Sequence, residues 1–156
     1  LTSTWMEGAG GMLPIATILL LALALGGVSK ALGTGVFVAS LVGETLPAWL
    51  LPACLFLASG FIAFAVGSSW GTFSIMLPIA VPVASALGVD PTLLVAAVLS
   101  GGIFGDHSSP ISDTTIVSSL ASGTEHIQHV STQLPYALLA GGVSIIGFLM
   151  LGLILL

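Results

Sequence analysis

The sequence predicts an all-α membrane protein in which two long apolar segments are broken near their centres. Composition carries the first part of this prediction: of the 156 residues, 56% are hydrophobic and only 4% are charged. A water-soluble domain carries roughly 25% charged residues, so this chain cannot cover a soluble surface. Nucleic-acid binding is excluded as well, because Lys30 is the one basic residue and phosphate neutralisation takes several.

The first region, residues 1–46, is expected to hold a scaffold span followed by an interfacial helix. Residues 1–11 are small and polar, and nearly continuous apolar sequence then runs from position 12 to position 28. A stretch of this length can cross the ~30 Å hydrocarbon core of a bilayer. Residues 31–46 are shorter and punctuated by glycine, which favours a helix lying in the interface. The carboxylates at segment ends are expected to be solvated: Glu7, Glu44 and Asp90.

The middle region, residues 47–123, is expected to form the transport-type part of the molecule. A hairpin over 47–88 is broken by the polar cluster 67–72, and a helix over 92–120 is broken by the polar stretch 105–115. In hydrocarbon, broken backbone is tolerated only where protein or a water-filled cavity surrounds it. Transporters place ion and substrate sites at such breaks. The alternative is that the two broken segments are ordinary pairs of kinked helices. Residues 47–88 return to the same side of the membrane whether they form a re-entrant hairpin or cross it twice.

The last region, residues 124–156, is expected to be a loop and a final transmembrane helix. Residues 121–135 read as the clearest aqueous loop, and residues 136–156 are apolar without any charge. His126 and His129 lie in that loop and are expected to be solvated. The loop lies opposite Lys30 if residues 92–120 cross the membrane once, and on the same side if they form a second hairpin.

Asp106 and Asp113 are the residues most strongly expected to carry chemistry. A carboxylate in a membrane segment costs at least ~2.5 kcal/mol on insertion scales and persists where it faces a cavity and has a function. Hard cations prefer carboxylate, hydroxyl and carbonyl oxygens, and hydroxyl side chains surround these two aspartates. The stretch therefore predicts a small alkali-cation site, whose nearby hydroxyl ligands are Ser108, Ser109, Ser112 and Thr114.

The same stretch suggests its own local structure. Proline is favoured at the first position of a helix and serine at its N-cap, so Pro110 and Ser109 are expected to start the second half-helix. Asp113 then lies in the first turn, where the positive helix end favours the carboxylate and burial favours the acid. Such a group can exchange a proton for a cation. The alternative is that Asp113 only caps the helix while Asp106 lies in an interfacial loop.

Three further features of the sequence need an interpretation. His107 is either a proton-relay partner or a hydrogen-bonded structural residue. Cys54, the one cysteine, is expected to be a small buried hydrophobe. Residues 67–71 match the G-x-S-x-G nucleophile pattern, which suggests an intramembrane serine hydrolase with Ser69 as nucleophile. In such hydrolases this pattern forms a sharp turn that follows a strand, whereas this sequence has apolar helical stretches on both sides.

Residues 101–119, GGIFGDHSSPISDTTIVSS, closely resemble the signature of the NhaC family of sodium/proton antiporters. Residues 67–82 also resemble that family, and the order of elements is more distantly similar to divalent-anion/sodium symporters of the ion transporter superfamily. The resemblance implies one inverted repeat containing a re-entrant hairpin and a broken helix, with residues 105–110 as its unwound middle. It places these residues at the hairpin tip: Ser68, Ser69, Trp70, Gly71 and Thr72. The tip lacks the asparagine of the symporters' Ser-Asn-Thr motif, which favours a bare cation over a carboxylate substrate.

The resemblance implies a secondary active transporter that exchanges sodium for protons by alternating access, and not an enzyme. Asp106 and Asp113 would bind sodium or protons in turn, with hydroxyl ligands from the two breaks; sodium is cargo, and no cofactor is expected. The implied partners are the lipid bilayer, sodium and protons, a missing N-terminal repeat of the same transporter, and a second copy in a homodimer. The implied location is a bacterial or archaeal cytoplasmic membrane, and the chain is expected to be a C-terminal fragment.

Two alternatives to this function stay open besides the hydrolase. One is a sodium-coupled organic-acid exchanger such as a malate/lactate antiporter, which the same family includes. The other is a non-transporting membrane fragment or assembly subunit.

Overall fold

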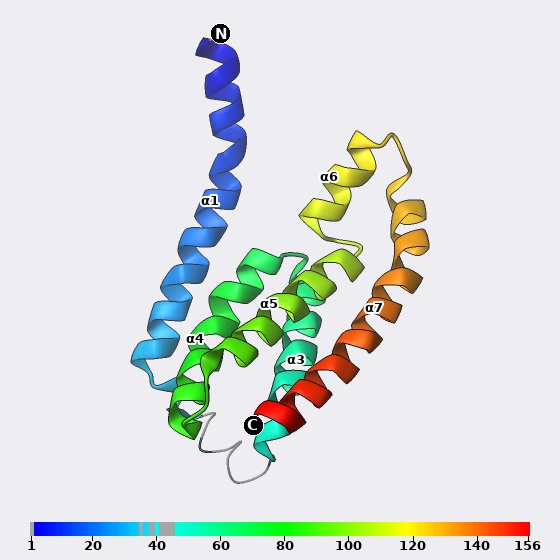
Figure 1. Ribbon diagram of the computed structural model, residues 1–156. Helices are drawn as coiled ribbons and strands as arrows, with labels where there is room; N and C mark the ends of the chain where they lie inside the picture. Colours follow the sequence, from blue (N-terminus) through cyan, green and yellow to red (C-terminus); the bar gives the residue numbers. More distant parts are fainter. Residues whose placement is uncertain (1, 35, 38–39, 41–45) are drawn as a thin grey trace.

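The computed structural model describes residues 2–34, 36–37, 40 and 46–156, and this part of the chain is helical (Figure 1). Helix η1 is a short 3-10 helix and the others are α-helices. The elements are α1 (Thr2–Ala31), η1 (Ala48–Leu50), α3 (Leu51–Val66), α4 (Ser69–Leu87), α5 (Pro91–Ser108), α6 (Asp113–Ala121) and α7 (His126–Leu155).

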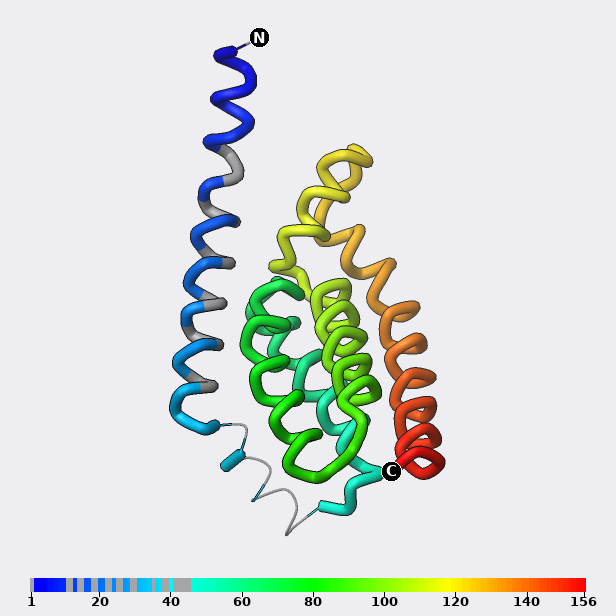
Figure 2. Tube along the Cα trace, turned by 60° about the vertical axis from the view of Figure 1, so that its left-hand side comes forward, coloured from blue at the N-terminus to red at the C-terminus, as the bar shows by residue number. Residues whose placement is uncertain are grey.

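The helices run alternately up and down a single bundle (Figures 1 and 2). Helix α1 descends beside α4, α3 rises, α4 returns, and α5 rises again between α4 and α7. Helix α6 continues the upward course of α5, and α7 descends along α3 and α5. The end of α1 at Ala31 and the turn between α6 and α7 therefore lie at opposite ends of the bundle.

Three described helices are long and apolar enough to cross a membrane: Ala48–Val66, Ser69–Leu87 and His126–Leu155. Both arms of the predicted hairpin are among them. Residues 47–88 thus form two antiparallel helices, each of spanning length. The prolines at positions 78 and 82 lie inside α4 without ending it.

Helix α1 is longer than the predicted span. It begins at Thr2, so the small polar residues before position 12 continue the helix instead of forming a separate lead. Helix propagation adds one hydrogen bond per residue, and this stretch contains no proline to stop it. Glu7 is exposed on α1; Glu44, most of the expected interfacial helix and the side chain of Lys30 lie outside what the structure describes.

Turn residues set the ends of the central helices. Gly67 caps the end of α3 and Gly88 caps the end of α4. Their φ angles of 73° and 68° lie in the left-handed region that glycine adopts without a steric penalty. Asp90 caps α5, accepting a 2.7 Å hydrogen bond from the backbone N–H of Thr92. Asp90 is exposed, as expected for a solvated segment end.

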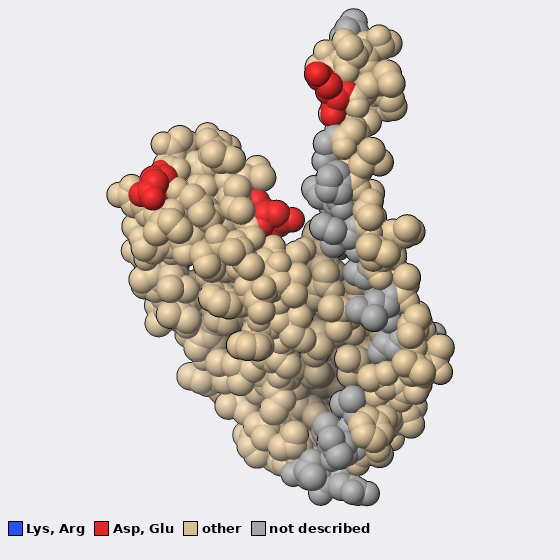
Figure 3. Space-filling model, turned by 180° about the vertical axis from the view of Figure 1, so that it is seen from behind, with Lys and Arg blue, Asp and Glu red and all other residues tan. Residues whose placement is uncertain are grey.

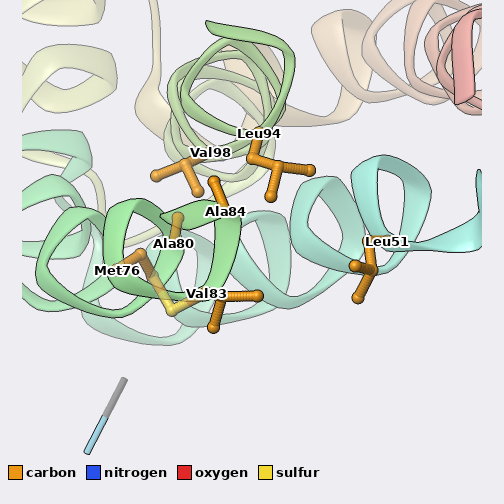
Figure 4. Close-up of a cluster of buried hydrophobic side chains, with 7 residues drawn as sticks. All are labelled: Leu51, Met76, Ala80, Val83, Ala84, Leu94 and Val98. Atoms are coloured by element: carbon orange, nitrogen blue, oxygen red, sulfur yellow. The ribbon is translucent and has the colours of Figure 1, made fainter. Parts of the chain in front are cut away.

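An apolar core fills the space between α3, α4 and α5 (Figure 4). The largest cluster of buried side chains contains Leu51, Met76, Ala80, Val83, Ala84, Leu94 and Val98. The small residues among them allow α4 and α5 to approach each other closely. Cys54 is a free, half-buried thiol on α3, so it is less enclosed than expected.

Helices α3 and α5 run in the same direction and pack through glycines. A Cβ atom on Gly101 would lie 2.2 Å from the carbonyl oxygen of Phe56, and one on Gly105 would lie 2.0 Å from that of Gly60. One turn further on, Ser109 bonds to the carbonyl of Phe64. Small residues four apart allow such close backbone contact, which is how membrane helices associate when lipid removes the hydrophobic driving force.

Helix α7 corrects the predicted loop over 121–135. Only residues 122–125 separate α6 from α7, and α7 continues through Pro135 to Leu155 as one helix. The loop was predicted to be solvated because these residues are polar. Their polar side chains instead bond to α6, to the chain around the end of α5 and to the backbone carbonyls of α7 itself.

Candidate cation site

The chain breaks between α5 and α6, and the break is later in the sequence than predicted. Residues 105–108 are still helical, and residues 109–112 form the link. The N-cap of α6 is Ser112, which accepts a 3.3 Å hydrogen bond from Thr115 N–H. Ser109 is not the cap, because its hydroxyl bonds across to α3, and Pro110 lies within the link instead of starting the helix. Asp113 is in the first turn of α6, as predicted.

Asp106 is buried beside this break, with only 2% of its surface exposed. Its two carboxylate oxygens accept one hydroxyl each: Ser112 Oγ donates to Oδ1 at 2.8 Å, and Thr114 Oγ1 donates to Oδ2 at 2.9 Å. The two hydroxyl oxygens lie 2.8 Å apart. Asp106, Ser112 and Thr114 therefore form a compact cluster of oxygen atoms, which we call the Asp106 cluster.

The break between α5 and α6 contacts the turn between α3 and α4. Asp113 N–H donates to the carbonyl of Gly67 at 3.4 Å, and Ser109 Oγ donates to the carbonyl of Phe64 at 2.7 Å. A Cβ on Gly67 would lie 2.6 Å from the carbonyl oxygen of Ile111. The two polar interruptions seen in the sequence are thus brought together, and each satisfies backbone groups that the other leaves free.

Besides Ser109, three predicted site residues make no side-chain hydrogen bond to Asp106. Asp113 is exposed, and its Oδ1 accepts from Thr114 N–H at 2.7 Å. Ser108 is buried but donates within α5 to the carbonyl of Phe104 at 2.7 Å. His107 is exposed with Nδ1 3.0 Å from the carbonyl oxygen of Ile103.

His107 instead borders an apolar groove between α5 and α7. The groove has a volume of about 460 Å³, and Phe56 of α3 is among its lining residues. Its polar lining residues are Ser100, His107, Gln133 and Ser144. Gln133 Nε2 donates to the backbone carbonyl of His107 at 3.0 Å, which ties α7 to the end of α5.

The predicted hairpin tip is shorter than expected. Gly67 and Ser68 form the turn, whereas residues 69–72 are the first turn of α4. Thr72 is buried and donates to the carbonyl of Ser68 at 3.0 Å, and Trp70 is 64% exposed. Within the described residues, no hydrogen bond joins the side chains of Ser68, Ser69 or Thr72 to Asp106, and none joins Ser69 to a histidine. The serine hydrolase interpretation has no geometric support.

His126 is a polar contact that sequence reasoning missed. Its Nε2 lies 2.6 Å from the carbonyl oxygen of Pro110, and its Nδ1 lies 3.2 Å from Ser119 Oγ. His129 Nε2 lies 3.5 Å from Ser118 Oγ. The signal available in the sequence was a pair of serines, Ser118 and Ser119, followed after six residues by His126 and then His129, which matches an antiparallel helix pair.

Charge is scarce on the surface away from these features. On the face seen in Figure 3, the carboxylates drawn in red lie in the upper part of the molecule. Many large apolar side chains are exposed on α1, α6 and α7, as expected for helices that face lipid or other protein.

An all-helical bundle with exposed apolar helices and a buried carboxylate at a chain break defines an integral membrane protein of the transporter class. Residues 1–153 match the Na+/H+ antiporter family. The chain belongs to this family, which is a family of transporters and not of enzymes. Antiporters named NhaC are among its relatives, so the resemblance drawn from residues 101–119 is confirmed.

The relatives differ in what their names say they transport. An uncharacterized protein of Haemophilus influenzae is 41% identical over 96% of this chain and 29% of its own length. The arginine/ornithine antiporter ArcD of Halobacterium salinarum is 36% identical, covering 69% of this chain and 22% of its own. The malate-2H(+)/Na(+)-lactate antiporter of Bacillus subtilis is 33% identical, covering 68% and 22%. The chain thus spans less than a third of the length of these relatives, and no solved structure matches it.

Proposed function

We propose that the protein exchanges sodium ions for protons across a bacterial or archaeal cytoplasmic membrane by alternating access. The observation that carries this proposal is the buried carboxylate of Asp106, which two hydroxyls contact at a break in the helix. Membership of the Na+/H+ antiporter family supports it. Sodium and protons are the cargo, and the bilayer surrounds the apolar faces of α1 and α7.

The chemistry follows from competition at one carboxylate. A buried carboxylate without a counter-charge is expensive, so a proton or a cation that neutralises it binds favourably. The hydroxyls of Ser112 and Thr114 donate to the charged form, and their oxygens are also ligands that a hard cation accepts. When sodium binds, the hydroxyl protons turn away and the oxygens face the ion. When a proton binds, the carboxyl is neutral and sodium is released.

Asp113 has a second role in this proposal. It lies at the positive end of α6, exposed and one residue from Ser112 and Thr114. A carboxylate there attracts sodium towards the Asp106 cluster, and the ion then moves to the buried carboxylate of Asp106. Ser108 and Ser109 donate elsewhere in this conformation, so they contribute oxygens only if the link moves during the transport cycle. The same applies to Ser68, Ser69 and Thr72.

We further propose that residues 47–88 form a re-entrant hairpin and that the described helices are one of two inverted repeats. Helix α7 has 30 residues, about 45 Å at 1.5 Å per residue, whereas α3 and α4 are shorter. The turn at Gly67 contacts the link before α6, and α6 continues nine residues beyond it. Figure 1 shows α1 and α7 also extending beyond this turn. The turn and the Asp106 cluster would then lie inside the membrane, where a second repeat or another copy would cover them.

An organic-acid exchanger is the second candidate. The groove beside His107 has the volume of a small-molecule site, and it is mostly apolar with a few polar groups. The malate/lactate antiporter named above shows that a relative acts on organic acids. In this case the groove takes the apolar part of the substrate and the Asp106 cluster takes the coupling ion.

One experiment separates the two candidates. The protein expressed from its complete reading frame is reconstituted in proteoliposomes, and proton flux is measured under gradients of sodium, potassium, malate or lactate. Sodium-driven proton flux without an organic acid supports sodium/proton exchange. Flux only with malate or lactate supports the second candidate, and flux unchanged by Asp113→Asn refutes the role of Asp113.

A further inference from the structure

We infer that His126 is a positioning residue for the Asp106 cluster, holding the link between α5 and α6 from the α7 side. The inference rests on the proposed function for its transport readout, but the geometry behind it is independent of the transported ion. His126 starts α7, 20 positions after Asp106 in the sequence, and it reaches the link through its ring.

The imidazole makes two contacts with different elements. Its Nε2 lies 2.6 Å from the carbonyl oxygen of Pro110. A carbonyl only accepts, so Nε2 carries a proton and donates it. Its Nδ1 lies 3.2 Å from the hydroxyl of Ser119, which is fully buried on α6 and also lies 2.8 Å from the carbonyl oxygen of Ile116. One ring therefore bridges α7, the link and α6.

The link has few backbone bonds of its own. Ser109 N–H donates to the carbonyl of Asp106 at 3.1 Å, and Ser112 N–H donates to the carbonyl of Ser109 at 3.4 Å. Ser109 fixes one side of it to α3 through the 2.7 Å bond to Phe64. Pro110 has no N–H to donate, so its carbonyl is the group through which α7 can hold the other side.

The bond between His126 and Pro110 affects the Asp106 cluster because Pro110 lies two residues before Ser112. The hydroxyl of Ser112 donates to Asp106 Oδ1. Without the bond from His126, the link gains freedom and the hydroxyl oxygen of Ser112 is held less firmly beside the carboxylate, where it would serve as a sodium ligand. Sodium affinity then falls, although His126 itself never touches the ion.

Three substitutions of the same residue test this inference on the protein from its complete reading frame. Glutamine places its amide nitrogen near the position of Nε2 and preserves the donor to Pro110. Asparagine is shorter and reaches only the position of Nδ1, near Ser119. Alanine removes both contacts. His129→Ala is the matched control, because His129 contacts Ser118 on α6 but not the link.

The half-saturating sodium concentration is the first readout, separated from the maximal rate of proton flux. His126→Ala and His126→Asn are expected to raise it roughly five- to tenfold, the effect of losing about one hydrogen bond, with the maximal rate nearly unchanged. His126→Gln and His129→Ala are expected to stay near wild type. A glutamine variant as impaired as alanine, or an alanine variant with unchanged sodium affinity, would overturn the inference.

Amide hydrogen exchange over residues 109–114 is the second readout and does not depend on transport. It is expected to be faster in His126→Ala and His126→Asn and unchanged in His126→Gln and His129→Ala. Unchanged exchange in the alanine variant overturns the inference even if the wild-type protein transports no sodium. A wild-type protein without sodium flux but with this exchange pattern instead refutes the proposed function and leaves His126 as the clamp on the link.

Discussion

The hydroxyl of Ser112 donates a 2.8 Å hydrogen bond to Oδ1 of Asp106, across the break that separates α5 from α6. The carboxylate is on one half-helix and two hydroxyls that contact it are on or next to the other half. Any movement of α5 relative to α6 therefore changes the hydrogen-bond partners of Asp106. The proposed alternating-access mechanism requires such a coupling between backbone movement and ion affinity.

Replacing Thr114 with valine tests the second hydroxyl of the cluster. Thr114→Val keeps the side-chain volume and removes the donor to Asp106 Oδ2. The variant also removes the Thr114 oxygen from the ligands proposed for sodium, so the half-saturating sodium concentration should rise about tenfold, the equivalent of about 1.4 kcal/mol. The control is Thr132→Val, whose hydroxyl bonds only to backbone of α7. Equal sodium affinity in Thr114→Val and wild type would show that this hydroxyl is not a ligand.

Gly105→Ala should destabilise the contact between α3 and α5. The added Cβ would lie 2.0 Å from the carbonyl oxygen of Gly60, so the helices must separate. Overpacking of this kind costs about 1–3 kcal/mol or more, which thermal unfolding in detergent would register as a lower midpoint. The control is Gly142→Ala on α7, where no atom lies within 4 Å of the new Cβ. A stable Gly105→Ala protein with unchanged sodium exchange would contradict the packing described for these helices.

A matched pair of glycines tests whether the hairpin turn must contact the link. Gly67 and Gly88 both have φ near +70°, so alanine costs about 1–2 kcal/mol of backbone strain at either position. Only Gly67 is also packed against Ile111, whereas a Cβ added at Gly88 would have no atom within 4 Å. Gly67→Ala is therefore expected to reduce both stability and sodium-driven flux more than Gly88→Ala. Equal effects of the two variants would mean that the contact with Ile111 is dispensable.

Asp90 gives a prediction for pH. Hydrogen bonds from Thr92, first from its side chain and then from its backbone N–H, hold the pKa of Asp90 below its ordinary value. A lowered pKa means that the carboxylate stabilises the fold above the unfolded-state pKa, and that this contribution is lost as pH falls through the folded-state pKa. The unfolding midpoint of Asp90→Ala should therefore lie below wild type at neutral pH, with the gap closing in acid. A gap that does not change with pH would contradict a role for the charge.

The sequence was sufficient to predict the helical membrane class and the presence of a break near residue 110. Scarcity of charge and long apolar runs determine the class, because lipid allows few other structures. Asp106 was also recognisable, since a carboxylate beside several hydroxyls in an apolar segment has few structural explanations. The family could be recognised from residues 101–119 alone.

The exact position of the break was not predictable from local preferences. Ser109 and Pro110 have the residue types of a helix start, but the hydroxyl of Ser109 bonds to Phe64, which is 45 positions away. Such a tertiary contact outweighs capping preference and moves the start of α6 to Asp113. Because α6 starts at Asp113, Ser112 takes the N-cap position that was predicted for Ser109.

The loop predicted over residues 121–135 failed for a related reason. Polar residues between two apolar segments resemble a solvated loop, whereas His126 and Gln133 bond to Pro110 and His107 from within α7. These partners lie 16 and 26 positions away in the chain, so sequence patterning over short windows cannot detect them. His126 was assigned to solvent for this reason.

The central claim is that sodium and a proton compete for Asp106, and proton release on sodium addition tests it most directly. Sodium is added to the purified protein in weakly buffered detergent solution, and the released protons are measured with a pH indicator. Wild-type protein is expected to release protons in proportion to bound sodium, and Asp106→Asn is expected to release none while remaining folded. Proton release of equal size from Asp106→Asn would place the exchange at another group and contradict the account.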